Sequence, residues 1–397
     1  PAYLQDKEGG LWIGNDGGGL FRYQKQQARD ISFGTGTDSV VATPWDEIWF
    51  LSEREIRNLD GILERQIEGL GQDKPHDILF SVRDQVYELI QGDKQVHLVL
   101  HEETGSRVTD SLPGQELGVA AVEGPWLVRG DMLYFVDVDH QLIPSIALHR
   151  TSPDYLWAVR GDESGVWLAE RGVGLHRFED GAIQSTYPWT GSAIRDLVDH
   201  DGELWVGTYG DGLVRLAQGE RAVTLGREEG LCDAMVSHLY RSSGDHLWFN
   251  SNAGLGRVSI DQLRSFFAGE GSGVDCSLVG AAEGNGPDGA VDGQGRFWAP
   301  TIQGLAMVDP AENWASLMPT LSISEARYGN QILQEGDRAR GKGSLSISYR
   351  GLLYSDPKGV RYRYRMLGLD DTWSSETSVQ RVDFPKLEPG TTPLKCV

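Results

Sequence analysis

The sequence predicts an all-β protein in which a single β-propeller is followed by an immunoglobulin-like β-sandwich. Eight aromatic residues, each in a short apolar strand, recur 37 to 50 residues apart, and the 51 glycines indicate many turns. A period near forty with a fixed aromatic and glycine-rich turns is typical of propeller blades of about four strands. These aromatic residues are Trp12, Trp49, Tyr87, Trp126, Trp167, Trp205, Trp248 and Trp298.

The repeat is clearest at residues 199–215, DHDGELWVGTYGDGLVR. An acidic turn, a strand with a tryptophan, a glycine-rich turn and a second strand make a hairpin, and a single hairpin cannot bury its own apolar face. The hairpins must therefore stack, and the eight units predict seven or eight blades. We expect an inner strand before each hairpin, the most apolar of the blade, at 2–5, 39–42, 78–82, 118–122, 155–159, 194–198 and 236–240.

The last unit contains an insertion at residues 259–290. Its IDQLRSFF segment predicts a short helix capped by Ser259 or Asp261. Long insertions in a regular repeat serve either as functional loops or as domain contacts.

The repeat ends near Asp309 and Pro310, so we assign residues 1–315 to the propeller and 316–397 to the sandwich, with its C-terminus truncated. Alternating strands separated by turn residues about every ten positions are typical of a sandwich. In residues 361–365, RYRYR, the period of two places arginines on one face and tyrosines on the other. We expect the tyrosines in the core and the arginines toward solvent.

The net charge of −22 argues against binding to nucleic acids or anionic lipid surfaces, because like charges repel. No uninterrupted apolar segment is long enough to predict a membrane-spanning helix. The chain opens inside a strand and turn, PAYLQDKEGG, which we interpret as a cut end rather than a signal peptide.

The three cysteines, Cys232, Cys276 and Cys396, have no metal-binding spacing. Cys232 and Cys276 fall in loops of neighbouring units. We expect two buried free thiols there, and a disulfide in an oxidising compartment is the alternative.

No motif indicates catalysis, a cofactor or a metal. The glycine triplets are followed by strands rather than by the helix that a phosphate loop needs. No loop offers the six oxygens of a calcium site, and neither HExxH nor GxSxG occurs. A catalytic acid–base pair formed by carboxylates from two distant blades is an open alternative. The sequence does not indicate which of the 58 acidic residues would form it.

Binding is the favoured activity, because the loops of all blades converge at one mouth of a propeller. The glycine-rich hairpin turns present amides, charged groups and an aromatic there, a mixture that suits a hydroxyl-rich ligand such as an oligosaccharide and equally suits ordinary turns. The candidate ligand-binding residues are Arg54, Arg129, Glu170, Arg171, Tyr209, Asp211, Asn250, Asn252, Thr301 and Gln303.

The units at 6–22 and 199–215 resemble the two-component regulator propeller repeat, D-x-x-G-x-L-W-x-G-T-x-G-x-G-L-x-R. The tail, SYRGLLYSDPKGVRYRYRMLGLDDTW followed by FPKLEPG, resembles the Y_Y_Y domain, named for its three tyrosines. This resemblance implies an extracytoplasmic sensor region, anchored to the inner membrane through a helix outside this sequence that leads to a histidine kinase or a diguanylate cyclase.

On this basis we expect a periplasmic module that binds a small ligand and signals through the sandwich by changing the geometry of a homodimer. The fragment itself is then not an enzyme. A secreted propeller hydrolase or lyase acting on polysaccharide is the alternative, and two facing carboxylates across the mouth would favour it. A protein-interaction scaffold would instead present a flat apolar face.

Overall fold

The computed structural model describes residues 2–6, 10–15, 19–23, 28–62, 67–68, 76–91, 94–114, 118–120, 124–148, 156–200, 203–240, 244–279, 284, 288–311, 320–334, 337, 343–352, 360, 362–366, 372–374, 377–387 and 394–396. The chain divides into two compact units, of which one is Gln26–Glu312 and the other combines Pro1–Lys25 with Asn313–Val397. Among the described residues, no helix is both long enough and apolar enough to cross a membrane.

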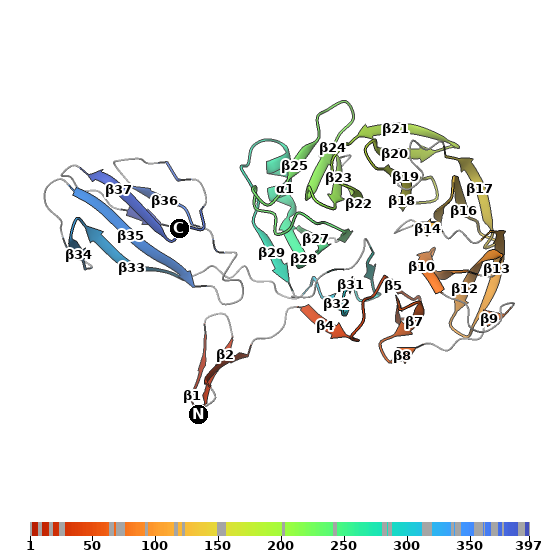
Figure 1. Ribbon diagram of the computed structural model, residues 1–397, viewed down its shortest axis with the longest axis horizontal. Coiled ribbons are helices and arrows are strands. Elements are labelled where there is room, and N and C mark those ends of the chain that lie inside the picture. The colour runs from red at the N-terminus through yellow and green to blue at the C-terminus, as the bar shows by residue number, and fades with distance from the viewer. Residues whose placement is uncertain are drawn as a thin grey trace. The chain divides into compact units, whose positions relative to one another are not determined.

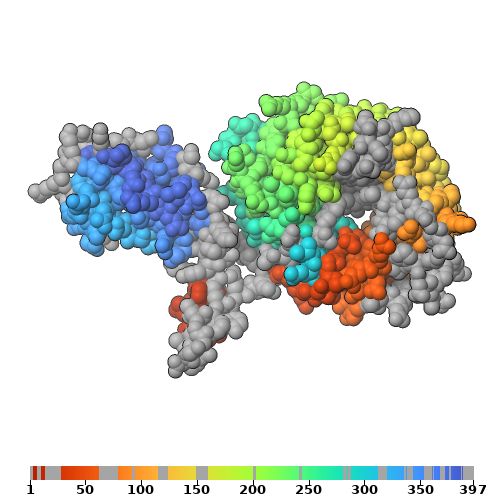
Figure 2. All heavy atoms as spheres, viewed as in Figure 1, coloured from red at the N-terminus to blue at the C-terminus, as the bar shows by residue number. Residues whose placement is uncertain are grey.

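The unit Gln26–Glu312 is a propeller of seven sheets (Figure 1). Each sheet has four antiparallel strands in a meander, and the second sheet gains a fifth short strand, β9. First strands of neighbouring sheets contact each other from the first sheet to the sixth, and also between the seventh sheet and the first. Figure 2 shows the atoms of successive sheets of this unit packed side by side around the ring.

The first four sheets follow the chain in order. They are β5(Ser39–Ala42), β6(Ile48–Ser52), β7(Glu55–Asn58) and β8(Gly61–Ile62); β10(His76–Val82), β11(Gln85–Gln91), β12(Gln95–Glu102) and β13(Gly105–Pro113), with β9(Ile67–Glu68); β14(Gly118–Ala120), β15(Trp126–Arg129), β16(Met132–Val136) and β17(Leu142–Ala147); and β18(Leu156–Gly161), β19(Gly165–Glu170), β20(Gly174–Glu179) and β21(Ala182–Pro188).

The last three sheets include the strand that closes the ring. They are β22(Ile194–His200), β23(Glu203–Thr208), β24(Leu213–Leu216) and β25(Val223–Leu225); β26(His238–Tyr240), β27(His246–Ser251), β28(Gly254–Ser259) and β29(Cys276–Val279); and β30(Ala290–Val291), β31(Phe297–Thr301), β32(Gly304–Val308) and β4(Ala28–Ser32). The outermost strand of the seventh sheet therefore comes from the N-terminal side of the first sheet.

This closure changes the role expected for the first repeat unit. Since β4 completes the seventh sheet by pairing with β32, the ring closes without the Trp12 unit. β1(Ala2–Gln5), β2(Leu11–Asn15) and β3(Gly19–Tyr23) form a separate three-stranded sheet, grouped with Asn313–Val397. The ring thus has seven blades, and residues 2–5 are not one of its inner strands.

The repeat motif is explained by the hairpin of the fifth sheet. Trp205 on β23 lies directly opposite Arg215 on β24. Glu203 accepts hydrogen bonds from Trp205 Nε1 at 3.4 Å and Arg215 Nη1 at 3.0 Å, so the acid, the aromatic and the arginine of the motif form one contact group. Gly212 has a φ of +76°, and a Cβ there would lie 2.3 Å from the Leu225 carbonyl oxygen, so only glycine fits.

The insertion after β28 forms α1(Ile260–Phe267), as predicted. Ser259 occupies the N-cap position, but its side chain makes no capping hydrogen bond. The helix is held instead by its apolar face, because Leu263 and Phe267 are buried in the core shared by the fifth and sixth sheets. It packs on the ring and is not an exposed loop.

Cys232 and Cys276 form a disulfide, which corrects the expectation of two free thiols. Cys232 lies on the connection between β25 and β26, and Cys276 begins β29. Their Cα atoms are 5.4 Å apart although 44 residues separate them in sequence. The segment that the disulfide closes contains β26, β27, β28 and α1, so the bond joins the connection before the sixth sheet to the outer strand that follows the helix.

In the other unit, β33(Thr320–Tyr328), β34(Gln331–Leu333), β35(Gly343–Leu352) and β37(Arg381–Leu387) form one sheet, and β36(Tyr364–Met366) pairs with β38(Leu394–Cys396). Their shared core contains Tyr349, Tyr362 and Tyr364. The tyrosines therefore point inward as predicted. Arg363 is exposed, but Arg365 is half-buried against Trp373, with the guanidinium carbon 4.6 Å from the ring centroid.

We expect loss of the disulfide to lower the thermal stability of the propeller. Closing a loop of this length stabilises a fold by about 2–4 kcal/mol, mainly through the unfolded state. Cys232→Ser should lower the melting temperature followed by tryptophan fluorescence, and Cys396→Ser serves as the control. Equal melting temperatures for the wild type with and without reductant would contradict this role.

Candidate functional site

The turns between the second and third strands of each sheet lie at the same end of the ring as the connections between sheets, because the strands alternate in direction. We call this end the mouth face and define it by the turns at residues 53–54, 130–131, 171–173, 209–212, 252–253 and 302–303. All ten predicted ligand-binding residues lie in these turns or within two residues of them.

The structure brings Tyr209 and Asn252 together from neighbouring sheets. Asn252 Nδ2 donates to Tyr209 Oη at 3.5 Å. The backbone N–H of Tyr209 donates to the Ala193 carbonyl at 2.8 Å, which fixes the turn to the start of β22. The side chain of Tyr209 is exposed, so its aromatic ring faces solvent at the mouth face from a turn whose backbone is held in place.

Asp211 belongs to the same turn and holds it against the preceding sheet connection. Its Oδ2 accepts from the Ser192 backbone N–H at 2.6 Å, and its own N–H donates to Ser192 Oγ at 3.0 Å. Asp211 is therefore occupied in positioning the Tyr209 turn.

Glu170 and Arg171 line a shallow, solvent-open depression of about 180 Å³, together with Ala169, Gly172, Trp189, Ser192, Ala193 and Ile194. Glu170 Oε2 lies 3.4 Å from His176 Nε2. This volume includes open solvent, and the depression leaves no interior space for a water molecule, so it does not enclose a ligand by itself.

Asn250 and Thr301 are buried and join neighbouring sheets instead of facing a ligand. Asn250 Nδ2 donates to the Pro300 carbonyl at 3.4 Å, and the Thr301 carbonyl accepts from the Thr37 N–H at 3.0 Å. The sequence pattern predicts both as turn residues, but in the structure they lie at the ends of the strands β27 and β31.

The remaining candidates are separated from Tyr209. Arg54 is exposed on the β6–β7 turn, with a φ of +64°. Arg129 donates to the Pro113 carbonyl at 2.8 Å. The Gln303 carbonyl accepts from Phe33 N–H at 2.9 Å beside the closing strand.

A buried charged network on the inner strands was not predicted, since these strands were expected to be the most apolar. Asp196 on β22 accepts from Arg160 Nε and Nη2 at 3.0 and 2.7 Å. It also accepts from the N–H groups of Leu197 and Leu239, both at 2.7 Å, and lies 3.0 Å from His238 Nδ1. Arg160, Asp196 and His238 thereby join the fourth, fifth and sixth sheets.

Burial alone would raise the pKa of Asp196, but the charges of Arg160 and His238 outweigh it and hold this pKa well below its usual range. Asp196 is therefore ionised at neutral pH. With both oxygens engaged, it is a structural anion and a poor candidate for a general acid or base. The charged pair Arg-Asp among the apolar residues at the start of the strand IRDLVDH is the sequence signal that could have revealed it.

Asp288 occupies the same register as Asp196 and His238, two residues before the one that pairs with the repeat aromatic. Its oxygens accept from the N–H groups of Val40 at 3.1 Å and Gly289 at 2.8 Å, so it connects the seventh and first sheets. Burial raises the pKa of Asp288 to about 6, although the side chain keeps partial exposure.

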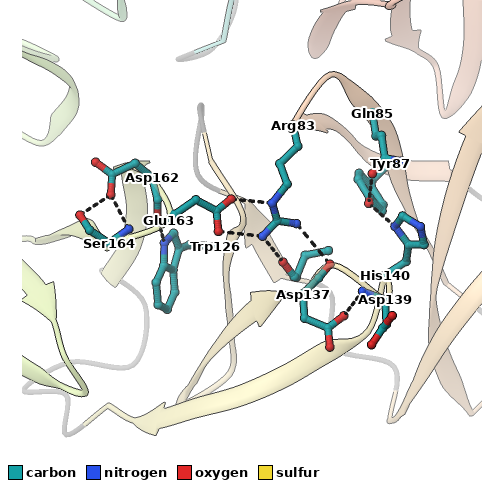
Figure 3. Close-up of polar contacts among 11 residues, drawn as sticks. Arg83, Gln85, Tyr87, Trp126, Asp137, Asp139, His140, Asp162, Glu163 and Ser164 are labelled. Carbon is teal, nitrogen blue, oxygen red and sulfur yellow. Dashed lines mark hydrogen bonds and ion pairs between the residues drawn. The ribbon is translucent and has the colours of Figure 1, made fainter.

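Polar residues also gather at the opposite end of the ring (Figure 3). Arg83, on the β10–β11 turn, makes a bidentate pair with Glu163, at 2.5 Å from Nε and 2.9 Å from Nη2. Its Nη groups also donate to the carbonyls of Val136 and Asp137 at 3.1 and 3.2 Å. These bonds engage the guanidinium, which clamps the second, third and fourth sheets together.

Among the residues that the structure describes, no group of three or more His, Cys, Asp or Glu side chains is arranged to hold a metal ion. The candidate site therefore consists of the exposed Tyr209, the half-buried Asn252, the depression beside them, and the inner strand β22 behind them.

Comparison with known proteins supports the fold. Residues 353–391 match the family model of the Y_Y_Y domain, which confirms the resemblance of the tail. No curated protein sequence matches the chain significantly.

Three solved structures share the architecture. The extracellular domain of the putative hybrid two-component system BT3049 from B. thetaiotaomicron has a TM-score of 0.66 at 15% identity, covering 100% of this chain and 58% of that one. The extracellular domain of the putative one-component system BT4673 from the same organism has a TM-score of 0.51 at 14% identity, covering 99% and 58%. A streptogramin B lyase has a TM-score of 0.51 at 15% identity, covering 72% and 96%.

The chain thus spans 58% of the length of both extracellular domains. At these identities the likeness concerns the fold, and it confirms the predicted all-β propeller followed by a sandwich.

We expect Asp196→Asn to destabilise the propeller by about 3–5 kcal/mol, because it leaves the buried Arg160 charge without its counter-ion. Chemical unfolding would measure the loss. Asp245→Asn is the matched control, since Asp245 is an exposed carboxylate of the same unit. A loss for Asp196→Asn no greater than for the control would contradict the role of this ion pair.

Asp288→Asn should change how stability depends on pH. A carboxyl group whose pKa is raised in the folded state favours folding while protonated, so its contribution falls as the pH rises from about 4 through 6. The difference in unfolding free energy between Asp288→Asn and the wild type should therefore move by about 2 kcal/mol in favour of the variant when the pH is raised from 4 to 7. Parallel stability curves for the two proteins would show that the pKa of Asp288 is not raised.

Proposed function

We propose that this chain is the extracytoplasmic ligand-sensing region of a membrane-anchored signal-transduction protein. The observation that carries the proposal is the likeness, over essentially the whole chain, to extracellular domains of two-component and one-component systems. The Y_Y_Y match in the tail supports it, and so does the disulfide, because disulfides persist in oxidising compartments. A periplasmic location fits these features.

The ligand site of this proposal is the mouth face around Tyr209 and Asn252. A solvent-facing aromatic with hydrogen-bonding neighbours suits a small ligand that presents both apolar and polar groups. We propose that the fragment binds a ligand and does not catalyse a reaction, since both oxygens of the buried Asp196 already accept hydrogen bonds.

Signal output lies in the longer parent protein. We propose that the parent is anchored to the inner membrane, acts as a homodimer and carries a histidine kinase or diguanylate cyclase domain. Ligand binding would change the output only if two arrangements of the dimer differ in ligand affinity.

A thermal-shift screen against oligosaccharides, peptides and divalent cations, with product analysis of each hit, tests the function. A ligand that binds the native state raises its melting temperature with the logarithm of saturation. We expect at least one compound to raise the melting temperature without being cleaved. In Tyr209→Ala, the same compound should raise the melting temperature by no more than half as much. Tyr3→Ala is the control, because Tyr3 is exposed on β1 in the other unit.

If every hit is cleaved, the hydrolase or lyase alternative replaces the sensor. If no compound in the panel shifts the melting temperature, the ligand-sensing function is contradicted and a scaffold role is favoured.

A further inference from the structure

Arg195 lies on the inner strand β22 at an irregularity in its pairing. Ile194 pairs with Thr208 and Asp196 pairs with the adjacent Gly207, so Arg195 is the extra residue of a β-bulge. Bulges redirect a side chain and are frequent beside functional sites. Here the bulge places an arginine next to the mouth face.

The guanidinium of Arg195 stacks on the ring of Tyr209, with its central carbon 4.9 Å from the ring centroid. It is half-buried, and its Nε is buried without a hydrogen-bond partner. Burial lowers the pKa of Arg195, and no carboxylate among the described residues offsets this effect. Within the part of the chain that the structure describes, Arg195 is thus a partly desolvated cation without a counter-ion.

This situation is unusual in a chain with 58 acidic residues and a net charge of −22. In the described part of the propeller, the other arginines that stack on rings all have an acidic neighbour. These are Arg83 with Glu163, Arg177 with Glu179, Arg257 with Asp245, and Arg296 with Asp292.

The surroundings of Arg195 also point to a ligand. Tyr209 Oη and the Asn252 amide supply hydrogen-bonding groups on the exposed side. The preceding residue, Ile194, lines the shallow depression, so Arg195 lies beside the rim. The nearby acid of that depression, Glu170, has His176 as its own partner.

We propose that Arg195, stacked on Tyr209, recognises an oxyanion group of the ligand, either a planar carboxylate or a tetrahedral sulfate or phosphate. This proposal rests on the proposed ligand-sensing function and adds the ligand's charge. A guanidinium binds carboxylates and tetrahedral oxyanions through paired N–H donors, and partial desolvation strengthens such contacts. The ligand is the counter-ion that Arg195 otherwise lacks.

Calorimetric titration of the 397-residue protein with defined probes tests the proposal. D-glucuronate and D-glucose differ in a carboxylate, and D-glucose 6-sulfate and D-glucose 6-phosphate supply the tetrahedral groups. We expect at least one anionic probe to bind at least tenfold more tightly than glucose. Glucuronate binding most tightly assigns a carboxylate, and a sulfate or phosphate ester binding most tightly assigns a tetrahedral group.

Arg195→Met keeps the length of the side chain but removes its charge, so it should weaken binding of the preferred anion at least tenfold. Its melting temperature without probe should equal or exceed that of the wild type, because a cation without a counter-ion is removed. Arg257→Met is the matched control, since Arg257 also stacks on a ring, with its guanidinium carbon 5.6 Å from the centroid of Trp248, and should leave anion binding unchanged.

Equal binding of an anionic probe by the wild type and Arg195→Met would overturn the proposal. So would glucose binding as tightly as the anions, an outcome that leaves the sensor function intact with a neutral ligand. Failure of the sensor function itself would instead appear in the broader screen, where no compound of any charge would shift the melting temperature.

Discussion

The propeller depends on the pairing of β4 with β32, because this pairing closes the ring. The apolar cores lie between neighbouring sheets, and each core takes residues from two of them. The core between the seventh and first sheets combines Trp298 and Leu305 with Val40 and Phe50. Without closure these two faces would be exposed to water, whereas every other core could still form from adjacent sheets.

Much of the fold could be predicted from local sequence because the repeat is a local contact group. Trp205, Arg215 and Glu203 meet within one hairpin, so their spacing appears directly in the sequence. Ring closure and the Cys232–Cys276 disulfide could not be predicted in this way. Both join segments that are distant in sequence, and no local pattern distinguishes β4 from the strands of the Trp12 unit.

The candidate site could be predicted only in outline. Tyr209 and Asn252 were identified because turn positions converge on one face of the ring. Turn position alone did not reveal that Asn250 and Thr301 are buried. Arg195 and Asp196 were missed because a short inner strand predicts apolar side chains. Only the partners from neighbouring sheets, Arg160 and His238, make the burial of Asp196 tolerable.

The closing strand also sets an order of events during folding. β4 is among the first segments of its unit to be synthesised, and its partner β32 is among the last. Until β32 is in place, β4 is an unpaired strand and the seventh sheet has an open edge, which is the kind of edge that promotes association between chains. Pairings between distant segments form slowly. The pairing of β4 with β32, which joins opposite ends of the propeller unit, is therefore expected to form more slowly than any single blade.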